Sequence, residues 1–143
     1  MSMINFIPGI QSSSSALTAE RIRMDVVSQN IANAHITRGL DGKPYQRQQV
    51  VFESVLADQQ AGMSGGAQTV QVARIQKDES PPHMIFNPTH PDADPNGMVA
   101  MPNVNMHQEW ADYITSSRAY EANVAVIKNA RSMALQTLSI GKR

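Results

Sequence analysis

The chain has 143 residues, and its 12 basic and 12 acidic side chains give a formal net charge of zero. That balance provides no electrostatic basis for binding nucleic acid or an anionic membrane surface. The absence of cysteine excludes disulfides, thiolate metal sites and cysteine nucleophiles.

The N-terminal residues show neither of the usual membrane-related signals. No apolar run approaches the eighteen or so residues of a membrane span, so direct membrane insertion is not expected. The opening sequence MSMINFIPGI has no basic n-region and no long apolar stretch, so a cleavable secretory signal is not expected either. Residues 1–9 are predicted to form a loose tail.

A first helix is predicted from Ser12 onward. Its apolar positions recur at steps of three, four and seven, which is typical of one helix face. The run of serines at 12–15 offers N-caps, and Asn33 and Gly39 suit the exit from the helix. The apolar positions are Leu17, Met24, Val27, Ile31 and Ala34.

A β-hairpin is predicted next. GLDGKP at 39–44 has the composition of a turn, and YQRQQVVFESVL at 45–56 and TVQVARIQ at 69–76 read as strands on either side of a glycine-rich loop at 62–66. In the second strand, alternation places Val70 and Val72 on one side, with either Ala73 or Ile75. An isolated hairpin is marginal in water, so this one is expected to lean on a helix or on a neighbouring molecule.

Residues 79–103 contain six of the eight prolines and three acidic side chains, with no lysine or arginine. We expect a long connection without regular structure. The sequence DADPNG at 92–97 resembles the first half of a calcium loop, but Asn103 stands where a bidentate glutamate is required. Two histidines, His83 and His90, lack further ligands at suitable spacing for zinc. No metal or cofactor is therefore expected.

The longest predicted element runs from Asn105 to Ile140, which contains no glycine and no proline. Asn105 is a suitable N-cap, Gly141 a suitable end, and the helix would be about 54 Å long. So long a helix with so narrow an apolar stripe requires partner helices. The stripe consists of Met106, Trp110, Tyr113, Ser117, Tyr120, Val124, Ile127, Arg131, Ala134 and Leu138.

Several polar residues within these helices allow two interpretations. Asn30, Asn33, Arg118, Glu121 and Asn123 fit an ordinary helix surface with a C-cap, or polar contacts that set the register between packed helices. Periodicity does not decide between them. No nucleophile motif, phosphate loop or paired acid and base is present, so the chain is not expected to be an enzyme.

The predicted fold class is therefore mainly α with a small β part. The N- and C-terminal helices pair as a coiled coil, and a central β-hairpin and an extended proline-rich loop lie between them. In this division, 1–38 and 103–143 form a discontinuous helical domain, and 39–102 form the central segment.

Six motifs resemble those of bacterial flagellar rod and hook axial proteins in order and spacing, from residue 16 to residue 141. They are ALTAERIRM at 16–24, SQNIAN at 28–33, GKPY at 42–45 with VVF at 50–52, NPTHPDAD at 87–94, MPNVN at 101–105 and SRAYEAN at 117–123.

The resemblance implies a subunit of the flagellar basal body, exported through the flagellar type III apparatus without signal cleavage. It implies assembly in the periplasm with copies of itself and neighbouring rod proteins, into a helical rod that transmits torque. A soluble coiled-coil adaptor or secretion chaperone is the alternative that helix periodicity also allows. The residues expected at subunit interfaces are Leu17, Met24, Val27, Asn30, Ile31, Asn33, Trp110, Tyr113, Arg118, Tyr120, Glu121, Asn123, Val124, Ile127 and Leu138.

Overall fold

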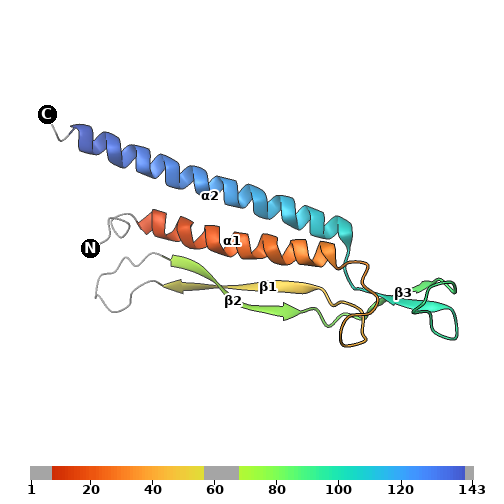
Figure 1. Ribbon diagram of the computed structural model, residues 1–143. Coiled ribbons are helices and arrows are strands. Elements are labelled where there is room, and N and C mark those ends of the chain that lie inside the picture. Colours follow the sequence, from red (N-terminus) through yellow and green to blue (C-terminus); the bar gives the residue numbers. More distant parts are fainter. Residues whose placement is uncertain (1–7, 57–67, 141–143) are drawn as a thin grey trace.

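Two long helices and two β-hairpins make up an elongated subunit (Figure 1). The computed structural model describes residues 8–56 and 68–140. It confirms the mainly helical class with a small β part. The elements in chain order are α1 (Pro8–Ala32), β1 (Gln48–Leu56), β2 (Gln68–Lys77), β3 (His83–Phe86), β4 (Met98–Met101) and α2 (Met106–Ile140).

Helix α1 begins at Pro8, so the predicted start near Ser12 is wrong by about one turn. Proline suits the first helical turn, where its missing N–H would have no partner within the helix. The serines lie inside the helix instead of capping it. Ser15 Oγ donates to Ser12 O at 2.8 Å and accepts from Val70 N at 3.1 Å, so this serine attaches the helix to the first hairpin. Of the predicted tail, residues 1–7 lie outside the described residues.

The end of α1 follows the sequence prediction. Both the backbone N and the side-chain Nδ2 of Asn33 donate to Gln29 O, at 3.0 and 2.7 Å. The turn predicted just beyond is present too, because Gly42 N donates to Gly39 O at 3.0 Å and Gly42 has a φ of 71°. The positive φ explains why glycine occupies that position.

The first hairpin confirms the predicted pair of strands. β1 and β2 are antiparallel from Gln48 opposite Lys77 to Leu56 opposite Gln68, with a register shift between Val51 and Phe52. Val51 faces Arg74 and Phe52 faces Val72, which leaves Ala73 as the extra residue of a β-bulge. The bulge switches the alternation, and this explains why Val70 and Val72 are half-buried whereas Ile75 is exposed. The predicted glycine-rich loop at 62–66 lies outside the described residues.

The proline-rich segment contains a second hairpin, so the prediction of no regular structure there is wrong. β3 and β4 pair antiparallel from His83 opposite Met101 to Phe86 opposite Met98. The long connection at 87–97 is held by hydrogen bonds, because Asn87 N donates to Gly97 O at 2.8 Å and Asp94 Oδ1 accepts from Asn96 N and Met98 N. The prolines lie outside the two strands, where no ladder hydrogen bond is required of them.

Helix α2 begins as predicted. Asn105 Oδ1 accepts from His107 N at 3.1 Å and from Gln108 N at 3.4 Å, which is the N-cap arrangement. The helix continues unbroken to Ile140, and the proposed stop at Gly141 lies outside the described residues.

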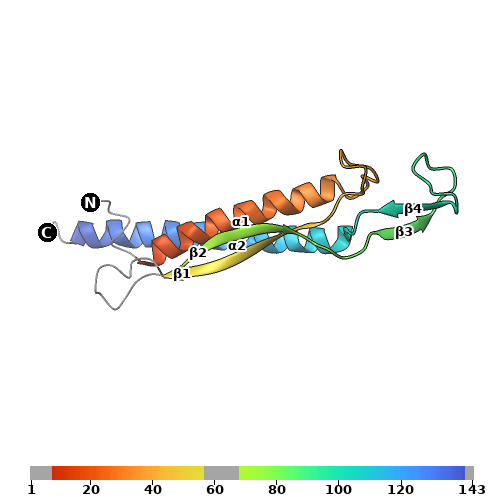
Figure 2. The ribbon, with the colours of Figure 1, turned by 90° about the horizontal axis from the view of Figure 1, so that it is seen from below.

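Helix α1 forms the middle layer of the subunit. It packs against α2 on one side and against β1 and β2 on the other (Figure 1). The two helices run antiparallel, and the β3–β4 hairpin extends from the end of the helix pair opposite to the C-terminal end of α2 (Figure 2).

The two helices differ in reach. Asn30 and Glu109 are hydrogen-bonded to each other, Pro8 lies 22 residues before Asn30, and Arg131 lies 22 residues after Glu109. At the standard helical rise both steps correspond to about 33 Å. The last turns of α2, residues 132–140, therefore extend past the first residue of α1, as Figure 1 shows.

The apolar core of the subunit is small. Among the described residues, the buried apolar side chains are Ala19, Val26, Val27, Ala34 and Val99. None is larger than valine, so the core contributes little burial free energy for a chain of this length. The junction of the helices with the hairpins is instead held by polar contacts.

Candidate functional site

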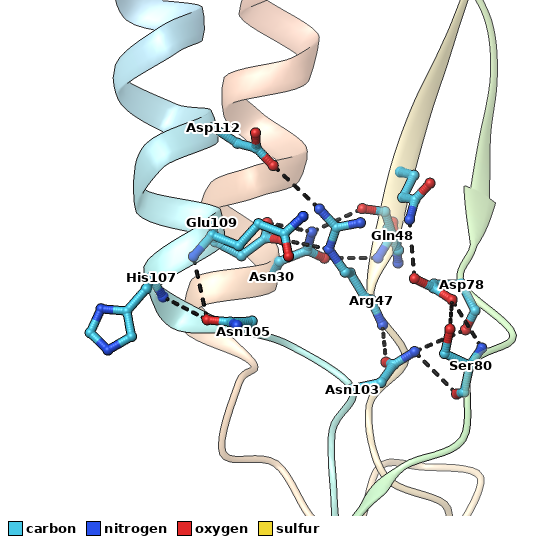
Figure 3. A network of polar contacts seen from close by, with 12 residues as sticks. Asn30, Arg47, Gln48, Asp78, Ser80, Asn103, Asn105, His107, Glu109 and Asp112 are labelled. Carbon is cyan, nitrogen blue, oxygen red and sulfur yellow. Dashed lines mark hydrogen bonds and ion pairs between the residues drawn. The ribbon is translucent and has the colours of Figure 1, made fainter.

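A buried polar network lies where α1, α2 and the start of β1 meet (Figure 3). Asn30 and Glu109 are both 0% exposed, and they rank with Val99 and Ser116 as the largest fully buried side chains described. Buried polar groups lower stability unless their hydrogen bonds are made. The contacts of Asn30 and Glu109 therefore decide whether this junction is stable.

Every hydrogen-bonding position of the Asn30 amide is occupied. Nδ2 donates to Gln48 O and to Glu109 Oε2, both at 2.9 Å. Oδ1 accepts from Tyr45 OH and from Gln48 N, also at 2.9 Å. The side chain thus pairs with the backbone of Gln48 as a neighbouring strand would, and it reaches α2 as well. Of the two interpretations of Asn30, the contact between helices is the correct one.

Glu109 forms the centre of an ion-pair cluster. Its Oε1 accepts from Arg47 Nε at 2.5 Å, and Arg47 Nη2 also contacts Asp112 Oδ2 at 3.4 Å. Arg23 on α1 lies 3.8 Å from the other oxygen of Asp112. The planar guanidinium of Arg47 therefore contacts two carboxylates one turn apart on α2, a geometry that lysine could not reproduce.

Asn103 fixes the chain just before α2. Its Oδ1 accepts from Arg47 N at 2.8 Å, and its Nδ2 donates to the carbonyl oxygens of Asp78 and Ser80 at 3.1 and 3.2 Å. Asp78 N in turn donates to Arg47 O at 2.7 Å. One asparagine therefore joins the entry to β1, the exit from β2 and the entry to α2.

Two groups near the junction have shifted pKa values. Burial raises the pKa of the Tyr45 phenol above its ordinary value of 10.0, and the negative charge of Glu109 raises it further. Hydrogen bonds from the side-chain hydroxyl and the backbone N–H of Ser80 lower the pKa of Asp78 below its ordinary value of 3.8. Both shifts favour the protonation states that the network uses at neutral pH.

The chemistry of this site is structural. Its carboxylates are engaged by arginine and asparagine donors, so none is poised as a general base. Within the described ranges 8–56 and 68–140, no cluster of three histidine, aspartate or glutamate side chains is arranged to hold a metal ion. No helix in the same ranges has both the length and the apolar character of a membrane span. The network can hold five chain segments in fixed positions relative to one another. These are α1, the entry to β1, the exit from β2, the residues just before α2, and α2 itself.

The predicted interface residues differ in how far they are buried within the subunit. Val27 and Asn30 are buried within the subunit. Nine others are half-buried, and they are Leu17, Met24, Ile31, Asn33, Tyr113, Tyr120, Asn123, Val124 and Ile127. Four are exposed, and they are Trp110, Arg118, Glu121 and Leu138.

The remaining polar candidates make local contacts. Asn123 Nδ2 donates to Ala119 O at 2.9 Å, within its own helix, and Asn33 caps the end of α1. The ion pairs found among the described residues do not include Arg118 with Glu121. For these residues the ordinary helix-surface and cap interpretation describes the contacts.

A second surface lies on the outer side of α2. Trp110 is half exposed and its ring meets Tyr113 edge to face, with centroids 6.3 Å apart. Ile114, one turn further on, continues this side of the helix. Other exposed apolar residues lie around α2 up to its end, and they are Val126, Met133, Leu135, Leu138 and Ile140.

Sequence reasoning missed the centre of the network. Glu109, Arg47 and Asn103 were not recognised as functional residues, because their partners lie far away in the chain. One signal was available for Glu109, since the buried α2 positions Glu109 and Ser116 are seven residues apart and the half-buried Asn123 lies seven residues further on. These residues are polar, so a search for apolar stripes passes over them.

Comparison with known proteins identifies the class to which this architecture belongs. The family model "Flagella basal body rod protein" matches residues 10–39, and "Flagellar basal body rod FlgEFG protein C-terminal" matches residues 96–140. These two ranges contain most of α1 and all of α2. A chain whose N- and C-terminal helices match both models is a flagellar rod protein.

Full-length relatives narrow the assignment. FlgC from Bacillus subtilis is 40% identical over 91% of this chain and 94% of its own length. FlgC from Borreliella burgdorferi is 42% identical over 92% of this chain and 94% of its own length. FlgC from Salmonella typhimurium is 41% identical over 90% of this chain and 92% of its own length. The chain belongs to the FlgC family of flagellar basal-body rod proteins. Its place is the flagellar basal body, and its relatives are structural proteins, not enzymes.

Proposed function

We propose that the protein polymerises through its terminal helices into the periplasmic rod and transmits torque as part of that shaft. The observation that supports this is the distribution of apolar side chains. Within the described residues, five small apolar side chains are buried, while thirteen large ones are exposed, seven of them on α2. A helix with so much apolar surface gains stability when neighbouring subunits cover it.

In this proposal the chain has two functional parts. Residues 1–38 and 103–143 form the helical core, whose α1–α2 pair packs as a coiled coil and is covered by equivalent helices of adjacent subunits. Residues 39–102 face outward or toward the next subunit. Contacts that repeat without closing would build a helical rod, whose torque passes through many packed contacts.

The proposed subunit contacts use the predicted interface residues in two ways. Exposed members, including Trp110, Arg118, Glu121 and Leu138, contact neighbouring subunits directly. Buried members such as Asn30 act indirectly, because they hold α1 and the hairpin in the position that presents this surface. Partners in the proposal are copies of this chain and neighbouring rod proteins, after delivery by the flagellar type III export apparatus.

A charge placed on the outer side of α2 tests the proposal. Ile114 is 53% exposed, so Ile114→Asp should leave the purified chain folded and soluble. In the rod the same carboxylate would be buried without a partner, so incorporation into basal bodies should fail. Ser54→Asp, at an exposed position of β1, is the matched control and should incorporate normally. Normal rods containing the Ile114→Asp chain would refute an assembly role for this side of α2.

A further inference from the structure

A groove of about 260 Å³ lies beside the polar junction, where α1, α2 and β1 meet. Part of its lining is charged, and Figure 3 shows Arg47, Glu109 and Asp112 where they come together. The rest includes four apolar side chains from α1 and β1, and they are Val26, Val27, Val50 and Phe52. We call this hollow the junction groove.

The junction groove carries balanced charges and retains hydrogen-bonding capacity. Arg23 and Arg47 are matched in its lining by Glu109 and Asp112. The side chains of Arg23 and Asp112 are 34% and 30% exposed, and Arg23 Nη2 lies 3.8 Å from Asp112 Oδ1. That distance is too long for a hydrogen bond, so Asp112 Oδ1 can accept one from a partner. The planar guanidinium of Arg23 can stack on an aromatic ring. The junction groove therefore suits an aromatic side chain that carries an N–H group.

Trp110 is the only tryptophan of the chain, and it is 50% exposed. Its ring meets that of Tyr113 edge to face, which holds the indole in a defined position on the helix surface. An aromatic ring held in this way loses little side-chain entropy when a partner binds. Tryptophan is among the residues that most often dominate the binding free energy of an interface. Its indole offers one N–H donor and no acceptor.

Trp110 and the junction groove lie on opposite sides of α2 at the same height. Asp112 follows Trp110 by two residues, which is about 200° around the helix and about 3 Å along its axis. Glu109, which precedes Trp110, also lines the groove. Trp110 therefore points away from the groove of its own subunit. A second copy placed alongside in the same orientation would bring its groove next to this indole without an axial shift.

We propose that the indole of Trp110 in one copy inserts into the junction groove of a second copy that lies beside it. This inference rests on the proposed rod function and specifies one of its contacts. The apolar lining covers the ring, Asp112 accepts the indole N–H, and Arg23 stacks on the ring face. The contact is heterologous, so each copy offers its indole to one neighbour and its groove to another, and the copies stand side by side around an axis.

Geometry and hydrogen bonding, and not charge, select this arrangement. The groove lining is electrically balanced, and the exposed side of α2 beyond Trp110 carries both Arg118 and Glu121. A two-fold pairing would place Trp110 against Trp110 and leave both grooves unfilled. Two indoles can only donate, so their N–H groups would gain no acceptor from each other.

Photocross-linking in assembled basal bodies tests the contact. A photoreactive benzoylphenylalanine in place of Trp110 retains an aromatic side chain, and expression beside the native chain allows rods to form around the labelled copies. Irradiation should join position 110 to residues 23–27 or 47–52 of another copy, located by mass spectrometry of the cross-linked dimer. The matched control carries the same label at Thr115, an exposed position of α2 about 140° around the helix, and it should lose this product.

The outcomes separate this inference from the proposed function. Immunoblots of purified basal bodies first establish that each labelled chain is incorporated. Incorporation without the predicted product, or attachment to α2 of another copy or to a different protein, would overturn the contact and leave the rod function standing. Absence of the native chain from basal bodies would overturn the rod function itself.

A reciprocal probe keeps the test decisive if a label at position 110 prevents incorporation. Benzoylphenylalanine in place of Arg23 puts the photoreactive group in the groove lining and leaves Trp110 intact. Irradiation should then join position 23 to residues 110–114 of another copy. Attachment to any other part of a second copy, or to another protein, would contradict the proposal.

Discussion

Removal of the charge at Glu109 should destabilise the subunit strongly. The Glu109 carboxylate is 0% exposed and accepts from both Asn30 and Arg47. Glu109→Gln keeps the shape but leaves the guanidinium of Arg47, whose side chain is only 15% exposed, without its main counter-ion, and it turns an amide NH₂ toward other donors.

The expected loss is about 3 kcal/mol of unfolding free energy, at the low end of the roughly 3–5 kcal/mol for removing one member of a buried pair. The low end applies because Asp112 remains 3.4 Å from Arg47 Nη2 and continues to offset its charge. Glu121→Gln makes the same chemical change at an exposed position of the same helix, and it should stay within about 0.5 kcal/mol of the native chain.

Urea unfolding followed by circular dichroism at 222 nm measures both variants. With a slope of about 2 kcal/mol per molar, Glu109→Gln should lower the midpoint by about 1.5 M with the slope unchanged. Combining it with Arg47→Met should cost less than the two single changes added together, because both remove the same interaction. If Glu109→Gln matched Glu121→Gln, the network would not stabilise the junction and this reasoning would fail.

Three further predictions concern other parts of the chain. The folded state holds the Tyr45 proton more tightly than the unfolded state does, so stability should fall as the pH rises above about 10, and Tyr45→Phe should weaken this alkaline loss in pH-dependent melting. Gly97→Ala should cost about 1–3 kcal/mol, from strain at positive φ plus the clash with the hairpin, whereas Gly42→Ala has positive φ but open space and should cost less in thermal unfolding. Val124→Asp or Ile127→Asp, at half-buried positions of α2, should block rod assembly without reducing expression, and rods of normal length in electron micrographs would contradict the assignment of this seam.

Local patterns in the sequence were sufficient to predict the secondary structure of most of the chain. The α2 N-cap at Asn105, the exit from α1 at Asn33 and the first hairpin follow from short-range chemistry, and the structure confirms each of them. The second hairpin was missed because proline-rich sequence predicts irregular backbone, whereas the prolines here lie outside two strands of four residues each.

The polar junction could not be predicted because its contacts span long sequence separations. Asn30 and Glu109 are 79 residues apart, and Arg47 and Glu109 are 62 apart. Helix periodicity places apolar side chains on the buried face, so it gives no reason to expect the charged Glu109 there. Only the convergence of Arg47 and Asn30 on it makes its burial favourable.

The central claim is that the outer side of α2 becomes buried when the subunit enters the rod, and thiol accessibility tests it most directly. Ile114→Cys and the control Ser54→Cys should both react readily with a maleimide in the purified chain, since both positions are exposed. In isolated basal bodies, we expect the thiol at 114 to react at least about tenfold more slowly while the thiol at 54 stays reactive, because labelling requires an accessible thiolate. Equal labelling of position 114 in the free chain and in basal bodies would contradict assembly through this helix.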